Sequence, residues 1–445
     1  MKKLNTWKVG FLGFQHVLAM YAGAVIVPLI VGPALHMNAA EVSYLIAFDL
    51  VTSGVASLIQ VVGGRHFGVR LPVILGCTYT AVPPIIAIGK MQGIEAVFGA
   101  VIASGVAVMI ISQFFSKVLK WFPPVVTGSV IVIIGVALIP VAMKNAAGGE
   151  GSPTFGHIEN LFLAVVTILS VVLINRFFKG YVQAISVLIS LVIGTIIAFF
   201  LGMVDLRPVM DAGWVRLIQP MYFGVPEFHL SAILTMTLVA LVSMVESMGV
   251  FLALGEVCDQ KMRPDRLKKG LRAEGMAAVI SGFFSSFPHT SFSQNVGLVA
   301  LSKVTKRSVV VASGLILILL GFLPKVAALT MIIPTAVLGG AMIPMFGMVI
   351  SSGIRMLEKV DFHRNENLLI VACSVGVGLG AAVVPDIFSQ VPQSVKLLVE
   401  NGIVVGSFTA FAMNLLLNRR QDSPSEGRGS NRVSFQEDSS VEATL

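Results

Sequence analysis

Long apolar runs separated by short charged loops recur along the chain of 445 residues. A helix needs about 20 mostly apolar residues to cross the hydrocarbon core of a bilayer. Charged residues make up only 12% of the chain, about half the share of a soluble domain, so lipid must cover most of the surface. The pattern predicts an all-α polytopic membrane protein of about 14 transmembrane segments, which begin near residues 11, 43, 71, 95, 123, 160, 181, 230, 272, 289, 308, 330, 367 and 400.

The positive charges gather in alternate loops between these segments. When the N-terminus is placed in the cytoplasm, 25 of the 31 lysines and arginines fall on the cytoplasmic side and the other six on the opposite side. This asymmetry follows the positive-inside rule, so we expect a multi-pass protein of the cell membrane with both termini in the cytoplasm. It also accounts for the net charge of +8 without a nucleic-acid partner. The polar residues 419–445 are predicted to form a disordered cytoplasmic tail.

Two of the segments are interrupted by hydroxyl, amide and aromatic residues. The third reads "LPVILGCTYTAVPPIIAIG" (71–89) and the tenth "FPHTSFSQNVGLVALSK" (287–303). In a seven-plus-seven division they are counterparts, and inverted-repeat transporters bind substrate at the midplane between two such broken helices. The β-branched and aromatic content of 77–80 and 290–294 favours two short strands, which would pair antiparallel. A kinked helix with its hydroxyls bonded to its own carbonyls is the alternative.

Pairing of the two strands would leave backbone N–H groups and the following half-helix facing a ligand. Phe292, Gln294 and Asn295 would then meet a small polar solute. A carboxyl group and the Gln294 amide together offer a complementary edge for a flat heterocycle. The rings of Tyr79 and Phe292 could cover its two faces.

A few ionisable side chains lie inside the predicted spans. Glu246 is central in the eighth segment, and burial of its carboxylate costs at least about 2.5 kcal/mol, so it is a candidate functional residue. Glu274 opens the ninth segment and is either functional or an acid at the N-terminal end of a helix. Asp49 is interpreted as a partner in helix packing, and His16 as either a structural histidine or a ligand contact. A carboxylic acid in an apolar site can exchange a proton near neutral pH.

The remaining chemistry of the sequence is sparse. Cys77, Cys258 and Cys373 have no CxxC spacing and no histidine partners, so we expect neither a metal site nor a disulfide. No nucleophile–base pair or nucleotide-binding loop is found, which argues against an enzyme.

The tenth segment carries a recognisable motif. "SQNVGLVALSK" (293–303) resembles the signature of the nucleobase–ascorbate transporter family. The resemblance extends over roughly residues 10–418 and is closest to the bacterial xanthine and uric acid permease branch. It rests on "GFQHVLAMYAGAVIVPLIVG" (13–32), "PPVVTGSVIVIIG" (123–135), "VESMGVF" (245–251), "FPHTSFSQN" (287–295) and "IIPTAVLGGAMIPMFGMV" (332–349).

This resemblance implies a seven-plus-seven inverted repeat of fourteen spans in two domains. A core domain of residues 1–122 and 228–328 would hold the substrate, with spans 1–4 and 8–11. A gate domain of residues 123–227 and 329–418, with spans 5–7 and 12–14, would support a homodimer and an elevator-like movement. The proton would be the coupling ion, and no cofactor is expected.

The resemblance also implies roles for individual residues. Glu246 and Gln294 would hydrogen-bond a purine, and Asn295 would shape affinity. Glu274 matches an essential carboxylate. Stacking, backbone and polar contacts would come from Thr78, Tyr79, Phe292, Ser293 and His16.

Two departures from the family pattern bear on the substrate. Some relatives have a histidine or an acid where this chain has Val250, and uracil-type relatives have glutamate where it has Gln294. Both differences favour an oxidised purine and leave Glu274 and Glu246 as candidate proton carriers. We therefore expect proton-coupled import of xanthine or uric acid. The alternatives are uptake of another nucleobase, such as uracil or guanine, or an anion carrier of the same plan, which the Glu246 carboxylate would disfavour.

Overall fold

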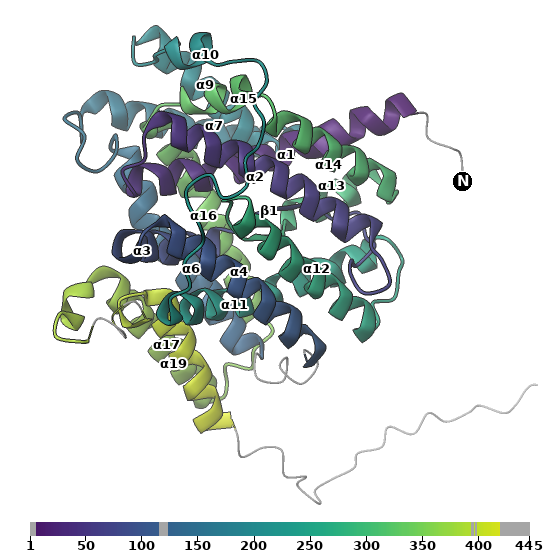
Figure 1. Cartoon of the computed structure of the whole chain (residues 1–445). Helices are drawn as coiled ribbons and strands as arrows, with labels where there is room; N and C mark the ends of the chain where they lie inside the picture. Colours follow the sequence, from purple (N-terminus) through teal and green to yellow (C-terminus); the bar gives the residue numbers. More distant parts are fainter. Residues whose placement is uncertain (1–5, 115–122, 393–395, 397, 419–445) are drawn as a thin grey trace, which may run out of the picture.

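The computed structural model describes residues 6–114, 123–392, 396 and 398–418 (Figure 1). The predicted tail at 419–445 lies outside these residues. The first half of the chain contains α1 (Thr6–Ala34), α2 (Ala39–Val62), β1 (Leu75–Cys77), the 3₁₀ turn η1 (Tyr79–Ala81), α3 (Val82–Gln92), α4 (Ile94–Ile111), η2 (Ser112–Phe114), α6 (Pro124–Ala146), α7 (Ile158–Phe177), α8 (Tyr181–Ala184) and α9 (Ser186–Phe200).

The second half begins with a connection that carries the short helix α10 (Arg207–Asp211). It continues with α11 (Leu230–Val257), α12 (Pro264–Phe283), β2 (His289–Ser291), α13 (Ser293–Ser302), α14 (Arg307–Gly321), α15 (Pro324–Met331), α16 (Thr335–Leu357), α17 (Asn365–Val383), η4 (Pro385–Phe388) and α19 (Gly402–Asn418). Each predicted segment start falls in or close to one of these elements; the twelfth, near 330, lies in α15, and the long helix α16 begins only at Thr335.

Helices of membrane-spanning length account for much of the molecule. Within the described ranges, eight helices are long and apolar enough to cross a bilayer: α1, α2, α4 with η2, α6, α7, α11, α16 and α17. The pair α14 and α15, bent by 81°, makes a ninth if it counts as one span. The apolar helices α9 and α19 are shorter. The chain is therefore a multi-pass membrane protein, and the number fourteen stays a prediction.

The interrupted segments form a two-stranded antiparallel sheet between the halves of the chain. Leu75 pairs with Ser291, Gly76 with Thr290 and Cys77 with His289. Figure 1 shows β1 near the middle of the molecule, where α1 and α2 contact it. Sheet pairing satisfies backbone groups that lipid could not.

The strands lie slightly earlier in the chain than the expected patches 77–80 and 290–294. In the first patch the backbone turns at η1, and α3 follows with Pro83 and Pro84 in its first turn. Proline favours the first turn of a helix because its missing N–H has no partner there in any case. In the second patch Ser293 already starts α13, so β2 ends at Ser291. The patch boundaries predicted from propensity were wrong by one or more residues.

Packing partners repeat between the two halves. The contact of α4 with α12 has a counterpart in the contact of α14 with α2. In the same way, α11 packs on α4 and α1 packs on α14. The contact of α17 with α19 corresponds to that of α7 with α9. α6 packs on its counterpart α16. These pairs correspond when α1 is matched with α11, α2 with α12, α4 with α14 and so on to α9 with α19. The same set of helix contacts is thus built twice, as a repeated unit requires.

Glycines allow the two equivalent crossings to be close. A Cβ on Gly105 of α4 would lie 2.6 Å from the carbonyl oxygen of Gly275 on α12, and the reverse contact has the same length. A Cβ on Gly314 of α14 would lie 3.0 Å from the carbonyl oxygen of Gly54 on α2. Membrane helices associate through such small residues because close backbone contact replaces the hydrophobic driving force.

Candidate substrate-binding site

A cavity of about 300 Å³ lies beside the two-stranded sheet. This volume is at the lower end of the range for small-molecule sites. The cavity is bounded by β1 and η1, by one face of α11, by β2 with the start of α13, and by α6 and α16. Its lining includes Cys77, Thr78, Tyr79, Thr80, Glu246, Gly249, Val250, Thr290, Ser291, Phe292, Ser293, Gln294, Met345 and Met348.

Glu246 and Gln294 face this cavity without a protein partner. Neither side chain forms a hydrogen bond within the described part of the chain, although both are polar; Glu246 is half-buried and Gln294 is exposed. Glu246 reaches the cavity because it shares a face of α11 with Gly249, Val250 and Ala253, which also line it. Polar groups inside a membrane protein are costly unless paired, so two unpaired ones in one cavity indicate a ligand site.

The N-terminus of α13 adds backbone donors to the same wall. Ser293 and Gln294 are its first two residues, and both line the cavity. The first N–H groups of a helix have no partner within the helix and favour acceptor or negatively charged groups. A carbonyl oxygen of a bound heterocycle would suit this position.

Two aromatic rings flank the polar groups. The rings of Tyr79 and Phe292 are nearly parallel, with an interplanar angle of 13° and centroids 6.5 Å apart. A planar ligand stacked between them, at about 3.5 Å from each ring, would need a ring separation slightly larger than this, about 7 Å. The Tyr79 hydroxyl donates to the Gly23 carbonyl oxygen at 3.0 Å, and Phe292 lies so close to Gly76 that a Cβ there would be 2.6 Å from the ring. Both rings are therefore held in place before any ligand binds.

His16 and Asn295 bond to each other instead of lining the large cavity. His16 Nδ1 lies 2.7 Å from Asn295 Oδ1, so the ring nitrogen donates to the amide oxygen. Asn295 Nδ2 donates to the carbonyl oxygen of Pro72 at 2.6 Å. Both side chains are buried behind Phe292 and Gln294. They tie α13 to α1 and to the segment before β1, which places them in support of the site.

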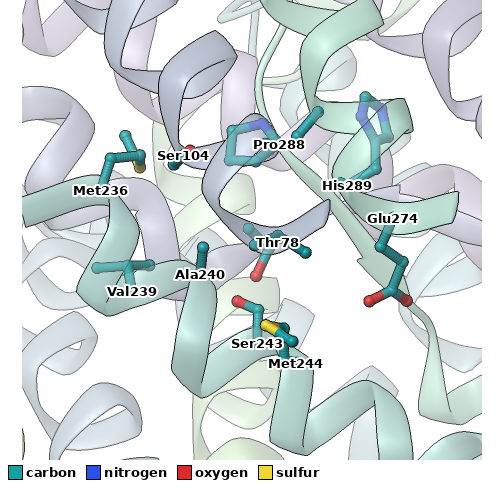
Figure 2. A pocket seen from close by; sticks show the side chains of 14 residues that line it. Thr78, Ser104, Met236, Val239, Ala240, Ser243, Met244, Glu274, Pro288 and His289 are labelled. Carbon is teal, nitrogen blue, oxygen red and sulfur yellow. The ribbon is translucent and has the colours of Figure 1, made fainter. Parts of the chain in front are cut away.

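Glu274 lies next to the large cavity and does not line it. Its carboxyl group is buried, and Ser291 Oγ donates to Glu274 Oε1 at 2.6 Å. Ser291 itself lines the large cavity, so a serine hydroxyl stands between Glu274 and any bound ligand. Glu274 lines a separate, smaller cavity of about 30 Å³, together with Thr78, Ser243 and His289 (Figure 2).

A second polar cluster was only partly anticipated. Asp49 accepts a hydrogen bond from Ser286 at 3.1 Å, and its Oδ1 lies 3.4 Å from His289 Nε2. The other ring nitrogen of His289 lies 2.8 Å from Ser281 Oγ. This cluster joins α2, β2 and α12 behind the sheet, so Asp49 acts as a packing partner. A histidine in a run of hydroxyl residues was the signal for it.

Hydroxyl groups around Glu246 were also overlooked. Ser247 Oγ lies 2.7 Å from Thr290 Oγ1, and Ser243 Oγ lies 2.9 Å from Thr80 Oγ1. The two serines flank Glu246 on α11 and connect this helix to η1 and to β2. The spacing of serines around a central acid could have identified them.

A family model described as Permease family matches residues 8–387 of the chain. Three curated relatives match along nearly the whole length. The nucleobase transporter PlUacP of Paenibacillus larvae is 55% identical over 93% of this chain and 96% of its own. The xanthine permease of Bacillus subtilis is 55% identical over 92% and 93%, and the uric acid permease PucK of the same species is 50% identical over 94% and 97%.

The fold is also similar to a solved structure. The transmembrane domain of a cyanobacterial bicarbonate transporter, BicA, superposes with a TM-score of 0.64. The match covers 86% of this chain and 97% of that chain at 18% identity. At this identity the likeness shows a shared transporter fold and nothing about the substrate.

Proposed function

The chain belongs to this permease family, and from that premise we propose that it imports xanthine or uric acid by proton symport. The observation that carries the proposal is the position of Glu246 and Gln294 in the same cavity. Both face one cavity of about 300 Å³, and neither has a partner among the described residues. The identity to a xanthine permease and to a uric acid permease supports the same substrate class.

An oxidised purine suits the cavity chemically. Its edges alternate N–H donors with carbonyl acceptors, and its ring system is flat. The Glu246 carboxylate accepts from an N–H, while the Gln294 amide both donates and accepts. The backbone N–H groups of Ser293 and Gln294 meet a carbonyl oxygen, and the rings of Tyr79 and Phe292 cover the purine faces.

Alternating access would come from movement of one group of helices against the other. Tyr79, in the predicted core domain, contacts Phe346 of α16, in the predicted gate domain, with centroids 5.7 Å apart. The cavity continues along α16 past Ser352 to Met356, beside the predicted cytoplasmic residue Arg355. We propose that this arrangement faces the cytoplasm, that loading from the other side needs an elevator-like shift, and that the gate domain supports a homodimer in the cell membrane.

Proton coupling would use the two carboxyl groups. Glu246 contacts the ligand, whereas Glu274 lies behind Ser291 and is close enough to Glu246 for the two to interact electrostatically. Urate is an anion near neutral pH, so its binding requires a protonated Glu246. An anion carrier has no use for this carboxyl group in its site, which disfavours that alternative despite the likeness of fold.

Radiolabelled uptake tests the proposal in cells that lack their own purine carriers. Unlabelled xanthine, urate, hypoxanthine, guanine and uracil are added as competitors, and a protonophore tests coupling. We expect xanthine or urate to compete and the protonophore to collapse accumulation. Competition by uracil or guanine without competition by xanthine or urate refutes the substrate, and accumulation driven by sodium alone refutes proton symport.

A further inference from the structure

The small cavity beside the sheet has the size of a water site. Its volume is about 30 Å³, and it is bounded by α4, α11 and α12, by Thr78 after β1, and by Pro288 and His289 at the start of β2 (Figure 2). A water molecule needs at least about 10–15 Å³ and two to four polar partners. Thr78, Ser243 and Glu274 supply three such partners among otherwise largely apolar walls. In Figure 2 the hydroxyl groups of Thr78 and Ser243 face each other, and the Glu274 carboxyl group lies across from them.

A chain of hydroxyl groups leads from this cavity to the substrate cavity. Ser243 Oγ lies 2.9 Å from Thr80 Oγ1, which lies 2.7 Å from Thr78 Oγ1. Thr78 and Thr80 line the substrate cavity, while Thr78 and Ser243 line the small one. Each hydroxyl can accept one hydrogen bond while it donates another. The three residues therefore form a continuous hydrogen-bonded connection through the wall between the cavities.

This chain of hydroxyls gives Glu274 a connection to the substrate cavity, which its carboxyl group does not line. Its Oε1 accepts a hydrogen bond from Ser291, whose hydroxyl proton is therefore directed at the carboxyl group and away from the cavity. A water molecule in the small cavity would join the Glu274 carboxyl group to Ser243 and from there to Thr80 and Thr78.

We propose that the small cavity holds a water molecule which, with Ser243, Thr80 and Thr78, carries protons between Glu274 and the substrate cavity. This inference rests on the proposed proton symport. In the transfer, the water accepts the Glu274 proton and gives one of its own to Ser243. Each hydroxyl then passes on its own proton as it receives one. One proton leaves at Thr78, and no bond between heavy atoms changes.

The charged and titratable neighbours of this route are few. His289 faces the small cavity from β2, but its Nδ1 lies 2.8 Å from Ser281 Oγ and its Nε2 lies 3.4 Å from Asp49 Oδ1. Both ring nitrogens are therefore engaged outside the chain of hydroxyls. Glu246 follows Ser243 by three residues on α11 and faces the substrate cavity. It is the natural recipient of a proton that arrives at Thr78.

The test replaces the middle link of the chain. Thr80→Val keeps the shape of the side chain and removes its hydroxyl, whereas Thr80→Ser keeps the hydroxyl. The purified protein is reconstituted into liposomes that contain a pH-sensitive dye. Purine-driven proton flux is measured and divided by the rate of purine counterflow, an exchange that moves no net protons.

We expect this ratio to fall about tenfold or more for Thr80→Val, the size of effect that loss of a proton-transfer group produces. Thr80→Ser should keep the wild-type ratio. An unchanged ratio for Thr80→Val, or an equal loss of both rates, overturns the relay. Wild-type protein that transports purine without protons refutes the proposed symport itself, which is a different result.

A second pair of variants covers the case in which Thr80→Val is not recovered folded. Ser243→Ala removes the hydroxyl next to the small cavity. Thr235→Val removes another hydroxyl of α11, one that donates to the Ser231 carbonyl oxygen of the same helix. The relay requires the ratio to fall for Ser243→Ala and to stay unchanged for Thr235→Val, and equal ratios for the two variants overturn it.

Discussion

Replacement of Glu246 by glutamine isolates the contribution of one carboxyl group to binding. The change keeps the size of the side chain and exchanges one oxygen for an NH₂ group. In the structure this carboxyl group faces the substrate cavity and has no hydrogen-bond partner within the described residues. The free protein therefore loses no hydrogen bond, and Glu246→Gln should change the affinity for the ligand and leave the stability of the free protein unchanged.

The expected loss follows from the type of hydrogen bond removed. A hydrogen bond to a charged group contributes about 1.5–3 kcal/mol. At about 1.4 kcal/mol per factor of ten, the Kd should rise about ten- to 150-fold. With ligand at about 100 times the wild-type Kd, the wild type gains about 2.7 kcal/mol of stability. A variant with a Kd about 100-fold higher gains only about 0.4 kcal/mol.

Thermal unfolding of the purified protein, with and without xanthine, measures this difference. We expect Glu246→Gln to melt like the wild type without ligand, to lose most of the ligand-induced shift, and to reach the membrane without supporting uptake. Glu256→Gln, an exposed carboxylate on the same helix, is the matched control and should keep the shift. A wild-type shift in Glu246→Gln refutes the binding role. A lower melting temperature of its free form means that the carboxyl group stabilises the fold.

Three further substitutions test the surroundings of the site. Gly105→Val should destabilise the protein by about 1–3 kcal/mol, because it separates α4 from α12. The control Gly347→Val places its side chain in open space and should not destabilise the protein. The melting temperatures of the two detergent-solubilised variants are compared, and equal values contradict the role of the crossing. Gly76→Ala should raise the KM for uptake with little change in expression, since a Cβ there displaces the Phe292 ring, and an unchanged KM argues against the ring as a binding surface. His16→Ala and Asn295→Ala should be non-additive in a double-mutant cycle of KM, because the two side chains bond to each other; additive effects mean that they act separately.

The central features of the site could be predicted because a membrane makes polar groups conspicuous. Glu246 and Gln294 stand out in apolar segments, and lipid tolerates unpaired backbone only beside a cavity. This physical constraint located both interrupted segments and the residues that line the cavity. The exact strand limits did not follow, because β propensity is weak, and Pro83 and Pro84 favour a helix start that ends the extended segment earlier than propensity indicates.

Side-chain pairing was the part that the sequence could not supply. The resemblance implied a polar contact from His16 near the substrate and a role in proton coupling for Glu274. Their actual partners, Asn295 and Ser291, depend on how α1 and α12 rotate against α13 and β2, which no local pattern encodes. Likewise, the hydroxyl link between Thr80 and Ser243 joins residues 163 positions apart in sequence. Its existence follows from the packing of α11 against the turn after β1.

The positions of the two carboxyl groups bear on how many protons accompany each substrate. Glu246 faces the ligand, so its protonation must match the ligand: ionised for an N–H of neutral xanthine, protonated for urate, since two like charges in a low-dielectric site repel. Glu274 is separated from the ligand by Ser291 and can hold the coupling proton in either case. Urate should therefore need one more proton than xanthine. We expect the KM for urate to fall more steeply than the KM for xanthine as the external pH is lowered. Parallel pH profiles for the two purines in the wild type contradict the assignment.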